Sequence, residues 1–209
     1  MDAQRLEPLL TAAMNAHGER MQRWIRASHL LAKMMKDPSI FTVDLQQVGR
    51  LDCFLVELEK TVAASPAPEH IVMAVDFHML LSRSWLALAY EALRAVLQRE
   101  RDSPLLPREL LDTFYRLELV RVPELKREVA GPRKLEQELY LTPAPHRDDD
   151  QPVPYRHRQT VWNIPKEMDT RSGSMIWHAY DVKSRTTVEI RRRELADGLL
   201  SALEMIAAA

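Results

Sequence analysis

The stretch from residue 69 to residue 101 contains neither glycine nor proline, which limits what this chain can fold into. Ser65 is a suitable N-cap ahead of it, and Ser103-Pro104 marks its end, because the residue before a proline disfavours helical geometry. We predict one helix of about thirty residues, long for a globular domain. The other elements have to be arranged around this helix.

The predicted long helix is apolar over much of its circumference. At about 100° per residue, its apolar side chains cover an arc of roughly 200°, wider than a surface helix requires. A helix with so broad an arc packs on two or more sides, so we predict that it forms the middle of a helical bundle. The arc comprises Ile71, Val75, Phe77, Met79, Leu81, Trp85, Leu86, Leu88, Ala89, Ala92, Leu93 and Val96.

The opposite face of the same helix carries a polar stripe of Asp76, Arg83, Glu91 and Arg94. These residues fall close to one line along the helix. The stripe is either a solvated face with helical ion pairs or a polar cluster that lines a ligand pocket or a subunit contact. His78 lies within the apolar arc, where a hydrogen-bonded core histidine is typical, and it is the fifth candidate ligand-binding residue.

The rest of the chain divides into a helical part and a mixed part. Residues 1–141 read as a helical bundle, 142–158 as a Pro-rich linker, and 159–209 as a β-hairpin plus helix packed on the bundle. We therefore predict a mainly α fold: a helical bundle around one long central helix, with a C-terminal β-hairpin and a terminal helix. The predicted helical segments besides the central one are 2–36 (divided near Gly18), 42–64, 107–120, 124–130, 133–141 and a last helix from about 192.

The hairpin is predicted from alternation of apolar and polar residues in 174–182 and 186–190. Two strands alone are marginally stable, so they need the bundle or a third strand, for which 159–162 is the candidate. Trp177 and Tyr180, on opposite faces of the hairpin, offer aromatic surface for an interface, unless one face packs on the bundle and the other is partly solvated. Arg191 and Arg192 follow as a basic turn, either solvated or in contact with phosphates or an acidic partner.

Composition narrows the function classes. The net charge of −1 gives no overall support for binding nucleic acid, and no apolar run reaches membrane-spanning length. The N-terminus lacks the pattern of a secretory signal, so we expect a cytoplasmic protein. The single cysteine, Cys53, lies in an apolar helical pattern and reads as a core residue. Neither a nucleotide-binding loop nor a helical metal-ligand pair is found, and we expect no metal and no cofactor.

The segment Arg23-Trp24-Ile25-Arg26-Ala27-Ser28-His29 fits an Arg-x(4–6)-His pattern. It resembles the motif of HEPN domains, which are small helical bundles, many of them metal-independent ribonucleases of toxin and phage-defence systems that act as dimers. The resemblance implies that Arg23 would stabilise the developing charge on the phosphate and that His29 would assist proton transfer.

Three functions are therefore open. The first is a non-enzymatic protein-interaction or regulatory module with a protein partner or a homodimer, indicated by surplus apolar helix surface and the aromatic hairpin. The second is the HEPN-like ribonuclease. The third is a small-molecule-binding protein that uses the polar stripe of the central helix.

Overall fold

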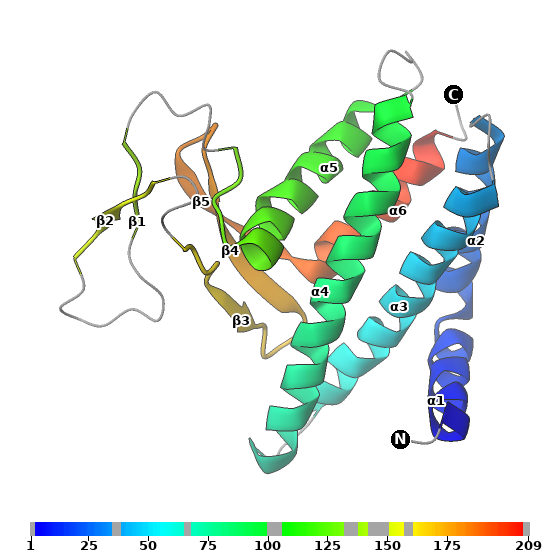
Figure 1. Ribbon diagram of the computed structural model, residues 1–209. Helices are drawn as coiled ribbons and strands as arrows, with labels where there is room; N and C mark the ends of the chain where they lie inside the picture. The colour runs from blue at the N-terminus through cyan, green and yellow to red at the C-terminus, as the bar shows by residue number, and fades with distance from the viewer. Residues whose placement is uncertain are drawn as a thin grey trace.

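The computed structural model describes residues 3–34, 39–64, 68–99, 106–131, 138–141, 151–156 and 161–206. Over these residues the chain is mainly helical, with a three-stranded antiparallel sheet before the last helix (Figure 1), which confirms the predicted fold class. The α-helices are α1 (Ala3–Ala16), α2 (Gly18–Met34), α3 (Ser39–Ala64), α4 (Pro68–Arg99), α5 (Arg108–Arg121) and α6 (Arg192–Met205).

The predicted central helix is α4, and it packs against both α3 and α5. Its C-terminal half supplies fully buried core residues, among them Trp85 and Leu93. Its apolar arc is wider than the surface it buries, because Phe77 is 45% exposed and Leu88 is 39% exposed. The helix is central to the bundle, but it leaves part of its apolar surface in contact with solvent.

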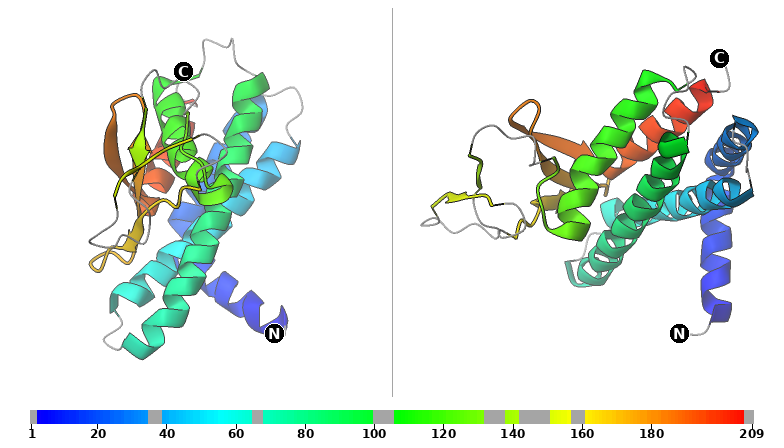
Figure 2. Two further views of the ribbon diagram at one scale, coloured as in Figure 1. Left: turned by 60° about the vertical axis from the view of Figure 1, so that its left-hand side comes forward. Right: turned by 45° about the horizontal axis from the view of Figure 1, so that its top comes forward.

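The chain from residue 3 to residue 34 is divided at His17, next to the glycine that the sequence indicated. α1 precedes the break and projects beyond the other helices, whereas α2 packs along α3 (Figure 2). The approach of α2 to α3 depends on Gly49, because a Cβ atom there would lie 2.6 Å from the Cβ of Trp24. Trp24 can therefore be fully buried between the two helices.

The helix α5 does not stop at its last regular turn. It continues into a π-helical turn, η1 (Val122–Lys126), which ends where Arg127 adopts a left-handed conformation with φ of 58°. The helix predicted for 124–130 is thus shorter and of a different type. A helix predicted for 133–141 is wrong at its end, since Tyr140–Leu141 is a strand (β1) paired with Val153–Pro154 (β2); residues 132–137 lie outside the described part.

The predicted hairpin is present as β4 (Met175–Asp181) and β5 (Thr186–Arg191). Its third strand is β3 (Lys166–Met168), which pairs antiparallel with β4. The proposed strand at 159–162 is wrong for Val161–Trp162, which have no regular structure; residues 159–160 are not described. The three-stranded sheet therefore begins at Lys166, later in the chain than the sequence indicated.

One contiguous hydrophobic core joins the helices and the C-terminal segment. Trp24 of α2, Leu93 of α4, Trp177 of β4 and Leu199 of α6 all belong to it. α6 packs on α2 and α5, so the last helix meets the second helix in this core. A second, smaller cluster around Trp162 lies beside the β1–β2 pair. The predicted linker of 142–158 is described only at 151–156, which includes β2.

Candidate functional site

Two carboxylates are buried where α3 meets the start of α6. Asp52 and Glu59 are seven residues apart, close to two helical turns, so both lie on one side of α3. Arg192 lies between them: its Nη1 is 2.7 Å from an Asp52 oxygen, and its Nε is 2.7 Å from a Glu59 oxygen. All three side chains are fully buried. A buried arginine thus joins the last helix of the chain to the third.

Further donors complete the coordination of both carboxylates. The Nε of Arg20 and the indole nitrogen of Trp24 lie 2.6 Å and 2.9 Å from the second oxygen of Asp52. The Nε of Arg193 lies 2.7 Å from the second oxygen of Glu59. We call the five charged residues of this network the buried ion-pair cluster: Arg20, Asp52, Glu59, Arg192 and Arg193.

The cluster holds its charges in fixed states. Burial would raise the pKa of both carboxyl groups, but their partners outweigh burial and hold each pKa below its usual value: Arg192 and Arg20 for Asp52, and His78 together with the arginines for Glu59. For Arg192, burial opposes the charged form, whereas Asp52 and Glu59 raise its pKa further. Every member is charged at neutral pH and is paired with an opposite charge. This arrangement fastens helices together; it does not provide a group poised for proton transfer.

His78 borders the same cluster. It is fully buried, with Nε2 3.6 Å from Glu59 and Nδ1 3.3 Å from the hydroxyl of Ser82. It is therefore the hydrogen-bonded core histidine that its position in the apolar arc indicated. Cys53 is buried nearby in α3, and burial raises the pKa of its thiol to about 11, which keeps it protonated at neutral pH.

A third buried carboxylate, Glu124, lies in the π-helical turn. Arg83 of α4 and Lys166 of β3 approach its oxygens at 3.2 Å and 2.6 Å, and the indole nitrogen of Trp177 lies 3.1 Å away. The turn is wider than an α-helix and places Glu124 under the sheet. The three donors tie α4, the sheet and the end of α5 together.

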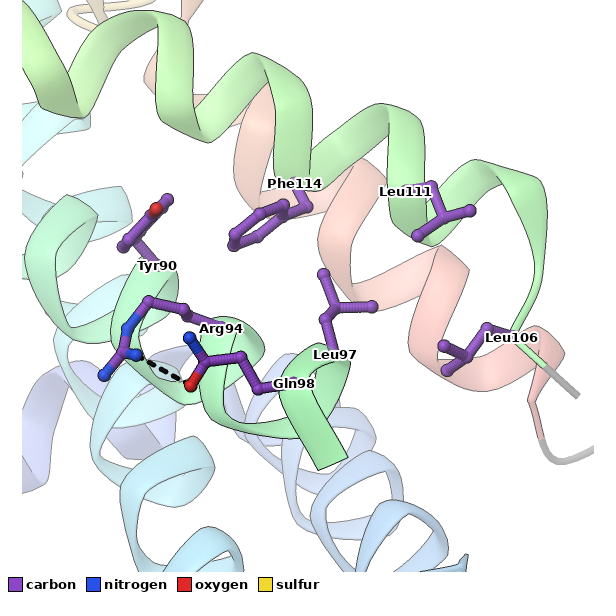
Figure 3. A pocket seen from close by; sticks show the side chains of 7 residues that line it. All are labelled: Tyr90, Arg94, Leu97, Gln98, Leu106, Leu111 and Phe114. Atoms are coloured by element: carbon purple, nitrogen blue, oxygen red, sulfur yellow. Dashed lines mark hydrogen bonds between the residues drawn. The ribbon is translucent and has the colours of Figure 1, made fainter. Parts of the chain in front are cut away.

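The described surface is hollowed between α4 and α5 (Figure 3). We call this hollow the α4–α5 pocket; its volume is about 430 Å³. Its lining is largely apolar, with polar groups toward one end. The lining residues are Tyr90, Arg94, Leu97 and Gln98 of α4, Leu106, and Leu111 and Phe114 of α5.

Stacked aromatic rings form the wall of the pocket. The rings of Tyr90 and Phe114 lie 4.8 Å apart at an interplanar angle of 18°. The guanidinium of Arg121 lies 4.3 Å from the centre of the Tyr90 ring, so this ring is held from two sides. Leu111 stands at the edge and is 47% exposed. The pocket is preformed, because its walls are fixed by contacts within the protein.

Two arginines and two carboxylates surround the Tyr90 ring at the polar end of the pocket: Arg94, Arg121, Glu91 and Glu118. Arg94 donates from Nε to Glu91 at 2.6 Å and from Nη1 to Gln98 at 2.8 Å. The other oxygen of Glu91 accepts a hydrogen bond from Arg121 at 2.8 Å. Two guanidinium groups thus share one carboxylate. The Arg94 side chain is 41% exposed, and it is therefore available to a ligand as well.

The structure does not bring the predicted polar stripe together as one site. Arg83 is held by Glu124, and Asp76 is exposed on the N-terminal half of α4. His78 lies inside the core on another side of the helix. Of the stripe residues only Arg94 lines the α4–α5 pocket, and Glu91 is its ion-pair partner. The stripe therefore contributes one residue to the lining of a hollow that the sequence did not locate.

The predicted ribonuclease pair lies on α2. Arg23 makes a two-pronged contact with Glu204 of α6, with both nitrogen–oxygen distances at 2.8 Å, and His29 is exposed. Among the interactions seen in the described residues, none joins Arg23 to His29. The HEPN-like activity of these two residues stays a prediction.

Two of the predicted interaction residues prove to be internal. Trp177 is 1% exposed, because β4 turns its Trp177–Ala179 face toward the helices. Arg192 is fully buried between Asp52 and Glu59, so its prediction as a surface contact is wrong. Tyr180 is half-buried against the small cluster, and Arg191 pairs with Glu189 and Glu194 at the surface.

No family model matches the chain, and neither the curated proteins nor the solved structures gave a match. None of the described helices is long and apolar enough to cross a membrane. Within the described residues, no three His, Cys, Asp or Glu side chains are grouped so that they could hold a metal ion. The assignment of function therefore rests on the geometry of the molecule itself.

Proposed function

We propose that this protein is a non-enzymatic protein-interaction module and that the α4–α5 pocket is where its partner docks. One observation carries the proposal: an apolar hollow, with walls fixed by stacked rings, is open beside a half-exposed leucine, Leu111. Apolar side chains that are held rigidly at a surface typically form the energetic centre of an interface.

The shape and the fixed walls of the α4–α5 pocket support a docking role. A groove between two helices receives anchor side chains of a partner segment, and the stacked Tyr90–Phe114 pair offers a flat surface for such an anchor. Since the contacts of Arg121 and Glu91 already order this wall, binding costs little additional conformational entropy.

The state of the chemically capable groups supports the non-enzymatic part. Asp52 and Glu59 are held by arginines inside the core, and His78 is enclosed beside them. The thiol of Cys53 is buried and protonated. These groups serve the packing of the helices, whereas the open pocket has an apolar lining suited to binding.

The test is a tagged pull-down from the native host with the wild type and two variants. Leu111→Arg places a charge at the pocket edge, and Val43→Arg makes the same change at a comparably exposed site on α3, which is 53% exposed. We expect one protein to be recovered with the wild type and with Val43→Arg, and its yield to fall about tenfold or more with Leu111→Arg. Thermal unfolding verifies that both variants are folded.

Two results would contradict the proposal. If no protein depends on Leu111, the pocket is not a docking site for a protein. If native mass spectrometry of the wild type shows a bound small molecule that Leu111→Arg removes, the small-molecule-binding alternative replaces the proposal. That alternative is favoured by one observation, the presence of the stripe residue Arg94 in the lining of the pocket.

A further inference from the structure

We propose that the α4–α5 pocket selects a peptide segment that carries one large apolar side chain next to an acidic residue. This inference rests on the proposed function and names the chemistry of the partner. The apolar side chain would enter between the leucines and Phe114, and the carboxylate would bind Arg94 at the polar end.

The pocket has an apolar end and a polar end. In Figure 3, Leu97, Leu106, Leu111 and Phe114 lie toward one side, whereas Arg94 and Gln98 lie together on the other side, below Tyr90. An occupant that fits both ends must itself be apolar at one end and polar at the other. The side chains of the leucines and of Phe114 offer no hydrogen bond, so the apolar end favours Leu, Ile, Met or Phe.

The polar end selects for negative charge. A guanidinium has five N–H donors, and the contacts of Arg94 within the protein use its Nε and Nη1. A carboxylate matches the remaining donors in a two-pronged geometry that a neutral amide reproduces less well. Arg94 is also 41% exposed, so the approach to it is open.

Glu91 does not cancel this preference, because its charge is shared. One of its oxygens binds Arg94 and the other binds Arg121. If Arg94 turns toward an incoming carboxylate, Glu91 keeps Arg121 as its partner. The exchange therefore leaves Glu91 paired with a cation. The charges around the Tyr90 ring are two arginines and two carboxylates, so the preference for an acidic segment comes from the donors of Arg94 that are not used within the protein and not from a net positive charge.

The experiment is a selection of random linear peptides on the wild-type protein, with counter-selection on Leu111→Arg. We expect the enriched peptides to share a large apolar residue with Asp or Glu within one helical turn of it. A representative peptide is then measured by fluorescence anisotropy against the wild type and against variants of the rim. Arg94→Glu should weaken binding about tenfold or more, and Arg94→Gln should weaken it by less.

The matched control is Arg116→Glu, on α5, whose side chain is 42% exposed and which pairs with Glu194 at 3.7 Å. Arg116→Glu reverses the same charge as Arg94→Glu at a side chain of similar exposure, but Arg116 lies outside the pocket lining. We therefore expect it to leave the affinity for the peptide nearly unchanged. A peptide in which the acidic residue is replaced by lysine should bind Arg94→Glu better than it binds the wild type. Restoration of binding by this swap assigns the carboxylate to Arg94 directly.

Three outcomes would overturn the inference. The first is enrichment of peptides with no shared acidic residue, and the second is an equal loss of affinity with Arg94→Glu and Arg116→Glu. The third is a failure to enrich any peptide that depends on Leu111. If the third occurs while a cellular partner is still lost with Leu111→Arg, the docking function stands, and the partner presents a surface of another chemistry.

Discussion

The interior of this protein and the surface between α4 and α5 contrast in what they contain. Asp52, Glu59 and Arg192 are charged and have no exposed surface, whereas Leu111 is apolar and nearly half exposed. Burying a charge is unfavourable unless the charge is paired. Inside, the compensation is visible, because each carboxylate is surrounded by arginines. At the surface, the described residues leave nearly half of Leu111 uncovered beside an apolar hollow, and on the proposed function a partner covers this patch.

The buried charges and the exposed apolar pocket have two different roles. The charges in the core specify which helices meet, since α6 can dock only where Arg192 reaches both carboxylates of α3. The pocket adds little to this specification, because its residues lie at the edge of the core. Changes in the first region should therefore appear in stability, and changes in the second region should appear in binding.

The largest effect is expected for Arg192→Met, which removes the one arginine that Asp52 and Glu59 share and leaves one buried oxygen of each carboxylate without its arginine donor. Breaking one partner of a buried ion pair costs about 3–5 kcal/mol in the free energy of unfolding. Urea unfolding measures this loss, and Arg191→Met is the control, since Arg191 pairs only at the surface. If the two variants lose similar stability, the buried cluster has no special role and the contrast between the two regions fails.

The next effect concerns Gly173, which places the turn between β3 and β4 against the end of α3. Its φ is +68°, and a Cβ atom there would overlap the backbone carbonyl of Glu59. Gly173→Ala should therefore destabilise the protein by about 3 kcal/mol, through strain and displacement of Glu59. Gly18→Ala is the matched control, because no atom lies within 4 Å of its new Cβ. A thermal unfolding midpoint unchanged in Gly173→Ala would contradict the packing described.

A smaller effect is expected from acid. Asp52 and Glu59 have pKa values below their ordinary range in the folded protein, so the unfolded chain takes up protons first. Their contribution to stability is complete above about pH 5, and it is lost as the pH falls through the unfolded values near 4 toward the folded ones. We expect a loss of about 2 kcal/mol or more between about pH 6 and pH 3 in urea titrations. A free energy of unfolding that stays constant over this range would show that these carboxylates are not held as described.

The sequence predicted the fold better than the site, and the reasons are physical. Helical periodicity is a local signal, so the long helix, the hairpin and the last helix were placed within a few residues. The π-helical turn and the short strand β3 have no local signal, because tertiary contacts of Glu124 and Lys166 determine them. Charge pairing between residues far apart in the sequence also leaves no local pattern, which is why the sequence predicts a surface position for Arg192.

The candidate site was missed for a related reason. Phe114 and Leu111 were recognisable as one apolar face of a helix, and Arg94 as a polar position on another. That these positions surround one hollow depends on how α4 and α5 approach each other. The spacing of Asp52 and Glu59 did carry a usable signal, because two acids on the buried side of a helix require cations from elsewhere in the chain.

The smallest effect on stability is expected at the pocket edge, where a change should affect binding and not folding. Leu111→Gln removes apolar surface that is 47% exposed, so the free energy of unfolding should change by no more than about 0.5 kcal/mol. The same variant should bind the selected peptide about tenfold more weakly, since a glutamine cannot replace the apolar contact at the edge. Leu110→Gln, one residue earlier and fully buried, should show the reverse pattern of a large loss in stability. Parallel urea unfolding and anisotropy measurements of the two variants separate the roles. If Leu111→Gln destabilises the fold as much as Leu110→Gln does, the role of Leu111 is packing, and the α4–α5 pocket is not a separate binding surface.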